Sequence, residues 1–158
     1  MSAAKPVILI INGPNLGALG IRQPEIYGTE DMTSVPPLVD KLLGPLAQGI
    51  ELEFFQSNHE GVLIDRLEKA RLDKVAGVIL NAGAFSHTSL ALADCLAWIE
   101  LPCVEVHLSN VLARANALRH QSHIAPHTIG LIAGFGITGY ALAVQALVRH
   151  LQLDINMA

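Results

Sequence analysis

Five short runs of apolar and β-branched residues recur along the chain, and each is separated from the next by a segment long enough to hold a helix. The runs span residues 7–12, 51–56, 77–81, 103–107 and 128–133. Such an alternation is typical of a parallel sheet whose strands are connected by helices. The pattern therefore predicts a five-stranded parallel sheet.

The segments between the runs are predicted to be helical at residues 34–48, 60–72, 88–99 and 137–151, with a weaker candidate at 112–119. Pro36 and Pro37 suit the first turn of the first helix, where a missing N–H is not needed. Gly44 and Pro45 are expected to kink or shorten its far end. Helices on both faces of the sheet give an α/β fold, a flavodoxin-like three-layer sandwich, and we expect a single domain over residues 1–158.

Composition narrows the class of partner. The chain has 158 residues, of which 51% are apolar, which suffices for one core without disulfides. A net charge of −4 without a run of Lys or Arg argues against nucleic acid and against a polybasic membrane contact. The apolar run at residues 7–11 is too short for a signal or a membrane span, so we expect a cytoplasmic protein that binds a small molecule. High apolar content with few charges also predicts a homo-oligomer.

Polar residues follow three of the predicted strands. They run from Asn12 to Asn15, from Asn81 to His87 and from His107 to Asn110. In this type of sheet, ligands bind beyond the carboxyl ends of the strands. A single Asn or Ser at a strand end is more often a turn former or a helix cap, but three such clusters at one edge indicate a site for a hydroxylated, anionic molecule.

The connection at residues 13–32 is unusually long for a compact α/β domain. Its glycines and its length predict a lid, with Arg22 and Tyr27 spaced so that both side chains fold over the strand ends. From spacing alone, an anchoring role for Tyr27 and a solvated Arg22 is the more ordinary interpretation.

Two further patterns are set aside. Residues 134–139 (GFGITG) satisfy the letter of a dinucleotide-binding motif, but no second strand with a ribose-binding acid follows, so the glycines are expected to serve a tight turn and close packing of helix on strand. His120, His123 and His127 resemble a metal cluster by composition, but Pro126 interrupts any helix that would bring them together. Cys95 and Cys103 lie in apolar segments and are expected to be buried thiols.

Six motifs, in order and at consistent spacing, resemble the signature of the type II 3-dehydroquinate dehydratases. They are residues 12–16 (NGPNL), 22–28 (RQPEIYG), 56–61 (QSNHEG), 81–84 (NAGA), 87–89 (HTS) and 105–110 (EVHLSN). The resemblance implies anti elimination of water from 3-dehydroquinate to give 3-dehydroshikimate through an enolate, without metal or cofactor. It also implies a dodecamer built from four trimers.

The resemblance implies residue roles as well. Tyr27 would be the base, with Arg22 as its activator, and His107 the acid, oriented by Glu105. Asn15 would hold a water that stabilises the enolate, beside a supporting Pro14. Substrate groups would be bound by Asn81, His87 and Arg119 and by the backbone N–H groups of Leu108 and Ser109, with Asp94 reaching into a neighbouring subunit's site.

Elementary electrostatics permits the role of the base. Free tyrosine has a pKa of about 10, so ionising it at pH 7 costs roughly 4 kcal/mol. One guanidinium at about 4 Å in an effective dielectric near 20 returns roughly 4 kcal/mol. A closed lid would be needed to keep bulk water from screening the pair.

The chain departs from the family pattern at two places. The segment 113–119 (ARANALR) is one residue longer than the usual Ala-Arg-x-x-Phe-Arg run. We expect Arg119 to contact the substrate and Arg114 to be peripheral or to gate the lid. Ala93 stands where relatives often have a basic residue, which weakens any charge pairing of Asp94 and suggests rearranged trimer contacts.

Two alternatives stay open from the residues alone. A flavodoxin-like module could bind FMN or another nucleotide with the loop at Gly13, although no P-loop Lys and Ser/Thr follow it. An oligomeric paralogue could also keep the scaffold without activity. The sequence does not distinguish a role in aromatic biosynthesis from one in quinate breakdown.

Overall fold

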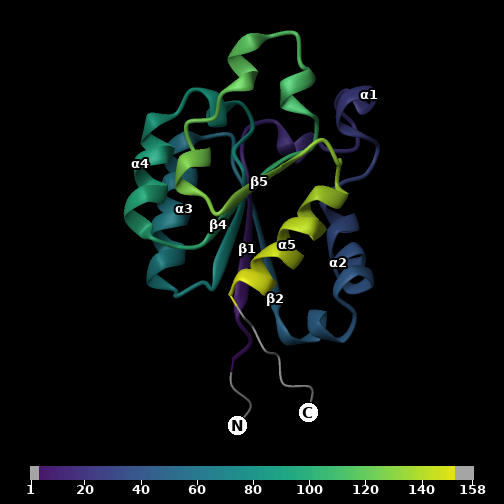
Figure 1. Ribbon diagram of the computed structural model, residues 1–158, viewed down its shortest axis with the longest axis vertical. Coiled ribbons are helices and arrows are strands. Elements are labelled where there is room, and N and C mark those ends of the chain that lie inside the picture. The colour runs from purple at the N-terminus through teal and green to yellow at the C-terminus, as the bar shows by residue number, and fades with distance from the viewer. Residues whose placement is uncertain (1–3, 152–158) are drawn as a thin grey trace.

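A computed structural model describes residues 4–151 of the chain. The strands are β1 (Val7–Asn12), β2 (Glu51–Gln56), β3 (Gly77–Asn81), β4 (Cys103–His107) and β5 (Gly130–Ala133). They form one parallel sheet in the order β2-β1-β3-β4-β5, which confirms the predicted sheet (Figure 1). The prediction of one domain over residues 1–158 extends at both ends beyond the described residues.

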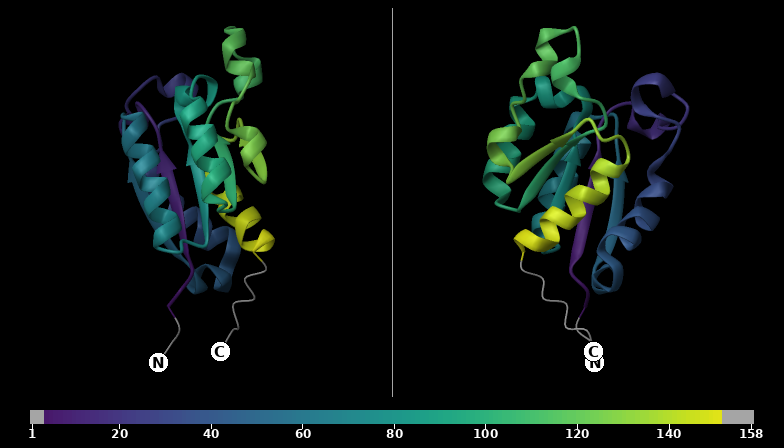
Figure 2. Two further views of the ribbon diagram at one scale, coloured as in Figure 1. Left: turned by 90° about the vertical axis from the view of Figure 1, so that its left-hand side faces the viewer. Right: turned by 45° about the vertical axis from the view of Figure 1, so that its right-hand side comes forward.

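Helices cover both faces of the sheet, as the three-layer prediction requires (Figure 2). On one face α2 (Val35–Leu43) packs against α5 (Thr138–His150), and on the other α3 (Glu60–Leu72) packs against α4 (Leu90–Ile99). Side chains of β1 alternate between the two resulting cores. Ile8 and Ile10 belong to the α2–α5 core, whereas Leu9 and Ile11 belong to the α3–α4 core.

Exposure follows each strand's place in the sheet. All residues of β3 and β4 are buried, because both strands have neighbours on each side and helices above and below. The edge strands β2 and β5 are half-exposed. Cys95 and Cys103 are buried free thiols, as predicted. Within the described residues, no helix is long and apolar enough to cross a membrane.

The first helix is shorter than the predicted span 34–48. It ends at Leu43, because Gly44 turns the backbone with φ 57° and Pro45 follows, and residues 44–49 continue as a 3-10 helix. The expected effect of Gly44 and Pro45 is thus confirmed. The last strand also starts later than predicted, because the N–H and the hydroxyl of Thr128 both donate to the Ala125 carbonyl oxygen and hold Thr128 in the preceding turn.

The predicted helix at residues 112–119 is wrong. Two 3-10 turns, Val111–Ala113 and Ala117–His120, take its place. The side chains of Asn110 and Asn116 accept hydrogen bonds from the N–H groups of Leu112 and Leu118, at 3.1 and 3.0 Å. Such local side-chain bonds compete with helical backbone bonds and start a new turn at each asparagine.

The glycine-rich segment after β5 has the predicted structural function. Gly134 and Gly136 have φ of 94° and 56°, so they form the tight turn into α5. A Cβ on Gly139 would lie 3.6 Å from side-chain carbons of Ile132 and Val106, which is ordinary packing distance between a helix and strands. The segment therefore joins β5 to α5 closely.

Candidate active site

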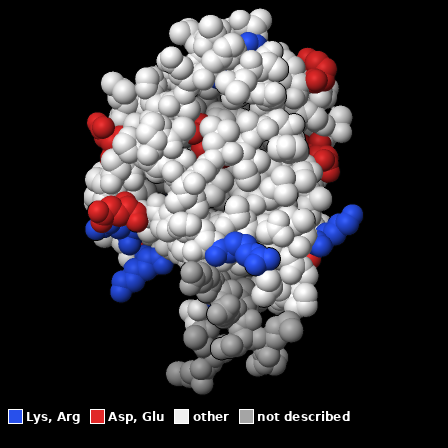
Figure 3. Space-filling model, in the orientation of Figure 1, with Lys and Arg blue, Asp and Glu red and all other residues white. Residues whose placement is uncertain are grey.

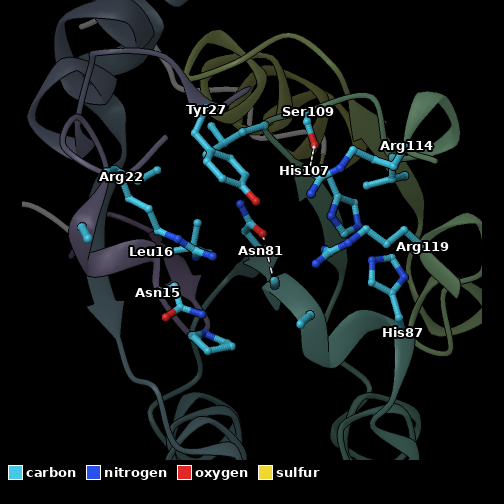
Figure 4. A pocket seen from close by; sticks show the side chains of 17 residues that line it. Asn15, Leu16, Arg22, Tyr27, Asn81, His87, His107, Ser109, Arg114 and Arg119 are labelled. Atoms are coloured by element: carbon cyan, nitrogen blue, oxygen red, sulfur yellow. Dashed lines mark hydrogen bonds between the residues drawn. The ribbon is translucent and has the colours of Figure 1, made fainter. Parts of the chain in front are cut away.

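A cavity opens at the carboxyl ends of the strands, lined by residues of the segments 14–27 and 107–119 (Figure 4). It encloses about 640 Å³, including the part open to solvent. The structure brings together here most of the residues predicted for the site, namely Pro14, Asn15, Arg22, Tyr27, Asn81, His87, His107, Leu108, Ser109 and Arg119. Residues more than a hundred positions apart in the sequence thus line one cavity.

The turn after β1 is built by close backbone contact. The N–H of Gly13 donates to the Asn81 carbonyl oxygen at 2.7 Å, and a Cβ on Gly13 would lie 2.5 Å from the Ala82 carbonyl oxygen. Only glycine fits at this position. This close contact between Gly13 and residues 81–82 joins the ends of β1 and β3 and places Pro14 and Asn15 at the cavity.

Asn15 has a left-handed backbone with φ 68°. Its N–H donates to Asn58 Oδ1 at 2.9 Å, and Gln56 Nε2 donates to both the Gly13 carbonyl oxygen and Asn58 Oδ1, each at 3.1 Å. Two side chains from the end of β2 therefore hold the turn that carries Asn15. Asparagine adopts this conformation more readily than most non-glycine residues, and these bonds hold it in place here.

His107 and Glu105 form a buried pair at the end of β4. The Nε2–H of His107 donates to Glu105 Oε1 at 2.6 Å, and Glu105 is fully buried. The hydroxyl of Ser122 donates to the same carboxylate, at 2.8 Å from Oε1 and 3.0 Å from Oε2. Glu105 is thus held from two sides, and through it the ring of His107 is fixed.

His87 stacks on His107, with ring centroids 5.8 Å apart and an interplanar angle of 19°. Its Nδ1–H donates to the Gln121 carbonyl oxygen at 2.6 Å. Partial burial lowers the pKa of His87 below its usual value, the charges of His107 and Arg119 act in the same direction, and the bond to Gln121 opposes them. His87 therefore favours the neutral form, with Nε2 as an acceptor.

The connection at residues 13–32, the predicted lid, carries Tyr27 at the cavity, at the end of α1 (Pro24–Tyr27), a short helix that the sequence did not predict. The guanidinium carbon of Arg22 lies 5.7 Å from the Tyr27 ring centroid, and that of Arg114 lies 6.0 Å from it. Figure 4 shows Tyr27 between these two arginines. The phenol thus faces two positive charges.

Arg114 is therefore not peripheral, and this part of the expectation is wrong. It lines the cavity beside Arg119, and its Nη1–H donates to Ser109 Oγ at 3.3 Å. Residues 111–120 fold as two turns rather than one helix, and this directs both arginines inward despite the extra residue. The Nε2–H of His120 donates to the Arg114 carbonyl oxygen at 2.8 Å and braces that fold.

Two predicted residues lie outside the cavity. Glu105 is behind His107, as its supporting role requires, and Asp94 is exposed on α4, away from the cavity of its own chain. A contact of Asp94 with another subunit's site stays a prediction. In residues 4–151, no group of three or more His, Cys, Asp or Glu side chains gathers as ligands for a metal ion.

The family model described as dehydroquinase class II matches residues 6–148. The chain belongs to the class II dehydroquinase family. It is 49% identical over 144 residues to the 3-dehydroquinate dehydratase of Dinoroseobacter shibae, an alignment that covers 91% of this chain and 93% of the relative. It is 44% identical over 153 residues to the catabolic 3-dehydroquinase of Pyricularia oryzae, with 96% of each covered.

Solved structures of class II dehydroquinases have the same fold. The type II dehydroquinase from Butyrivibrio crossotus superposes with a TM-score of 0.82 at 40% identity, covering 90% of this chain and 97% of the other. That from Propionibacterium acnes gives a TM-score of 0.78 at 36% identity, covering 96% and 99%. The flavodoxin-like arrangement predicted from the strand pattern is therefore that of the family.

Three residues of this class II dehydroquinase support the site but were not predicted from the sequence. Gln56 and Asn58 lie in a recognised motif but received no role, and Ser122 lies in none. Gln56 and Asn58 bond to the turn that carries Asn15, and Ser122 bonds to Glu105. In each case the two partners lie far apart in the sequence. For Gln56 and Asn58, the only signal in the sequence was their polarity at and just after the end of β2.

Proposed function

We propose that this chain is a 3-dehydroquinate dehydratase, which removes water from 3-dehydroquinate to give 3-dehydroshikimate. The proposal rests chiefly on one observation: a tyrosine between two arginines and a histidine on a buried carboxylate line the same cavity. A base and an acid in one cavity suit an elimination in which a proton and a hydroxyl leave different carbons.

In the proposed mechanism Tyr27 acts as a phenolate and takes the proton beside the ketone. The electron pair of the broken C–H bond forms an enolate. Arg22 and Arg114 each place a positive charge near the ring that takes up the proton. The enolate oxygen is stabilised by a water held by Asn15, beside Pro14.

The second step expels the hydroxyl group. The enolate collapses to the conjugated enone as the C–O bond breaks, and His107 gives a proton to the departing hydroxyl, which leaves as water. Glu105 fixes the His107 ring through Nε2, so that Nδ1 is the nitrogen that transfers the proton. Tyr27 then returns its proton to solvent, His107 takes one up from solvent, and no oxidation state changes. In the proposed steps the protons and charges come from side chains and solvent, so they use no metal or coenzyme.

Binding of the substrate is assigned to the remaining cavity residues. Its hydroxyl and carboxylate groups would be held by the side chains of Asn81, His87 and Arg119 and by the N–H groups of Leu108 and Ser109. Arg119 supplies the positive charge that a carboxylate requires. Asp94 is proposed to act in a neighbouring subunit.

We further propose a cytoplasmic homo-oligomer, a dodecamer of four trimers. The edge of β5 supports an assembly, because it borders an apolar hollow in which Leu112, Leu131 and Phe135 are 67%, 45% and 63% exposed. Charged side chains are sparse over the upper middle of this face (Figure 3). Light scattering tests the assembly, and a monomer would contradict it.

The direct test adds 3-dehydroquinate to the purified chain and records the ultraviolet absorption of the conjugated enone product. Absorption should rise with wild-type protein treated with EDTA and should rise far more slowly with Tyr27→Phe. No product from the wild type would refute the proposal. A yellow protein with bound FMN would instead favour a flavin-binding module.

A further inference from the structure

Three buried polar side chains lie beneath the cavity, and the proposed reaction uses only one of them. Asn12, at the end of β1, and Asn81, at the end of β3, are each 3% exposed, and Tyr140 of α5 is fully buried. Asn12 and Asn81 are direct partners in the sheet. Asn81 lines the cavity, whereas the other two residues lie behind it.

The hydrogen bonds among them determine each donor and acceptor. The backbone N–H of Gly83 donates to Asn81 Oδ1 at 3.2 Å, so the amide nitrogen of Asn81 must be on the opposite side. That nitrogen donates to the hydroxyl oxygen of Tyr140 at 2.8 Å. The single phenolic proton of Tyr140 is donated in turn to Asn12 Oδ1, at 2.6 Å.

This network fixes the group that Asn81 presents to a bound molecule. The amide nitrogen carries two hydrogens, of which Tyr140 accepts one. Figure 4 shows the amide nitrogen of Asn81 on the side of the Tyr27 ring, while the amide oxygen accepts from the Gly83 N–H. The cavity therefore receives an N–H donor from Asn81, suited to a carboxylate, carbonyl or hydroxyl oxygen.

Burial makes the network a stable support. Loss of the Tyr140 hydroxyl would leave Asn12 Oδ1 and Asn81 Nδ2 without their shared partner in a place where water does not reach. Burial also raises the pKa of the Tyr140 phenol, so its proton stays in place and keeps the direction of the bonds. It also makes Tyr140 unsuitable as the base.

We propose that Tyr140, supported by Asn12, is a positioning residue that holds the Asn81 amide with an N–H directed at an acceptor oxygen of the bound substrate. The proposal rests on the proposed function. It is a role in binding rather than in proton transfer, because neither Tyr140 nor Asn12 lines the cavity.

The test is a double-mutant cycle. Tyr140→Phe should raise KM about tenfold and change kcat less than about threefold, because the lost contact holds the substrate equally in the ground and transition states. Asn81→Ala should raise KM at least as much. In the Asn81→Ala background, Tyr140→Phe should change KM less than about twofold, since its route of action has been removed.

Two controls separate positioning from folding. Val144→Ala removes buried volume one turn further along α5 and should lower the thermal midpoint while leaving KM unchanged. Asn12→Ala keeps the Tyr140 phenol but removes the oxygen that accepts its proton, so it should also raise KM. If Tyr140→Phe does not fold, Asn12→Ala takes its place in the test. KM effects that add in the double variant, or an unchanged KM in Tyr140→Phe and Asn12→Ala, would refute the role. Wild-type turnover is measured first, because its absence would refute the proposed function instead.

Discussion

The side chain of Asn58 accepts a hydrogen bond from the backbone N–H of Asn15 at 2.9 Å, across the ends of β2 and β1. Asn15 is one of four non-glycine residues with positive φ in the described chain, and it borders the cavity. The exposed side chain of Asn58 therefore supports the left-handed turn at Asn15, which is proposed to hold the water that stabilises the enolate.

This relationship predicts that Asn58→Ala lowers kcat by about tenfold or more, because the turn that directs Asn15 relaxes. Asn58→Asp retains an oxygen that accepts from both Asn15 and Gln56, so its kcat should stay within about threefold of wild type. Steady-state rates of enone formation compare the two. Full activity of Asn58→Ala would show that the turn needs no such support.

The base and its activator should behave as one unit. Tyr27→Phe keeps the ring and removes the proton acceptor, so kcat should fall more than about a hundredfold while substrate still binds. Arg22→Ala should reduce turnover nearly as much. In the double variant the two losses should be far from additive, because both disable one proton transfer. Near-normal kcat in Tyr27→Phe would exclude Tyr27 as the base.

The two arginines of residues 111–120 should affect different kinetic constants. Arg114 lies against the Tyr27 ring and contacts Ser109, so Arg114→Ala should mainly lower kcat. Arg119 is the arginine proposed to hold the carboxylate, so Arg119→Ala should mainly raise KM. Michaelis–Menten analysis of both variants separates these effects, and the reverse assignment would mean that the extra residue exchanges their functions.

His87 should titrate at a lower pH than a free histidine, whose pKa is about 6.5. The neutral form of His87 is favoured in the folded state. His87 therefore contributes to the free energy of unfolding above about pH 6.5, and this contribution is lost as the pH falls through the lower pKa of the folded state. Histidine NMR across the titration measures the midpoint. Arg119→Ala removes a neighbouring charge and should raise it, whereas a wild-type midpoint above that of free histidine would contradict the assignment.

Gly13 and Gly61 provide a matched pair for stability. A Cβ on Gly13 would meet backbone atoms of Ala82 at 2.5 and 2.7 Å, so Gly13→Ala should cost more than about 2 kcal/mol in the free energy of unfolding. Gly61 lies in α3 with nothing within 4 Å of such a Cβ, and Gly61→Ala should be neutral or stabilising by up to about 1 kcal/mol. Denaturant unfolding measures both.

The sequence predicted the sheet and the gathering of polar residues because both follow from strand pattern and topology. Asn81 and His107 end their strands and Asn15 lies in the turn just after β1, so parallel pairing brings all three to one edge. The helix at 112–119 failed because two asparagine side chains redirect the backbone locally. Roles of Asn58 and Ser122 depend on side-chain contacts between distant segments, which no periodicity records.

The bond between Tyr140 and Asn12 spans 128 positions of the chain. Synthesis on the ribosome proceeds from the N-terminus, so both asparagines beneath the cavity emerge well before the phenol that links them. Until α5 docks, the Asn81 amide has only its bond to Gly83 to fix its orientation. If Tyr140 has the proposed role, α5 completes substrate recognition. A nascent chain that ends after β5 would then carry every residue that lines the cavity but would lack the phenol that orients the Asn81 amide.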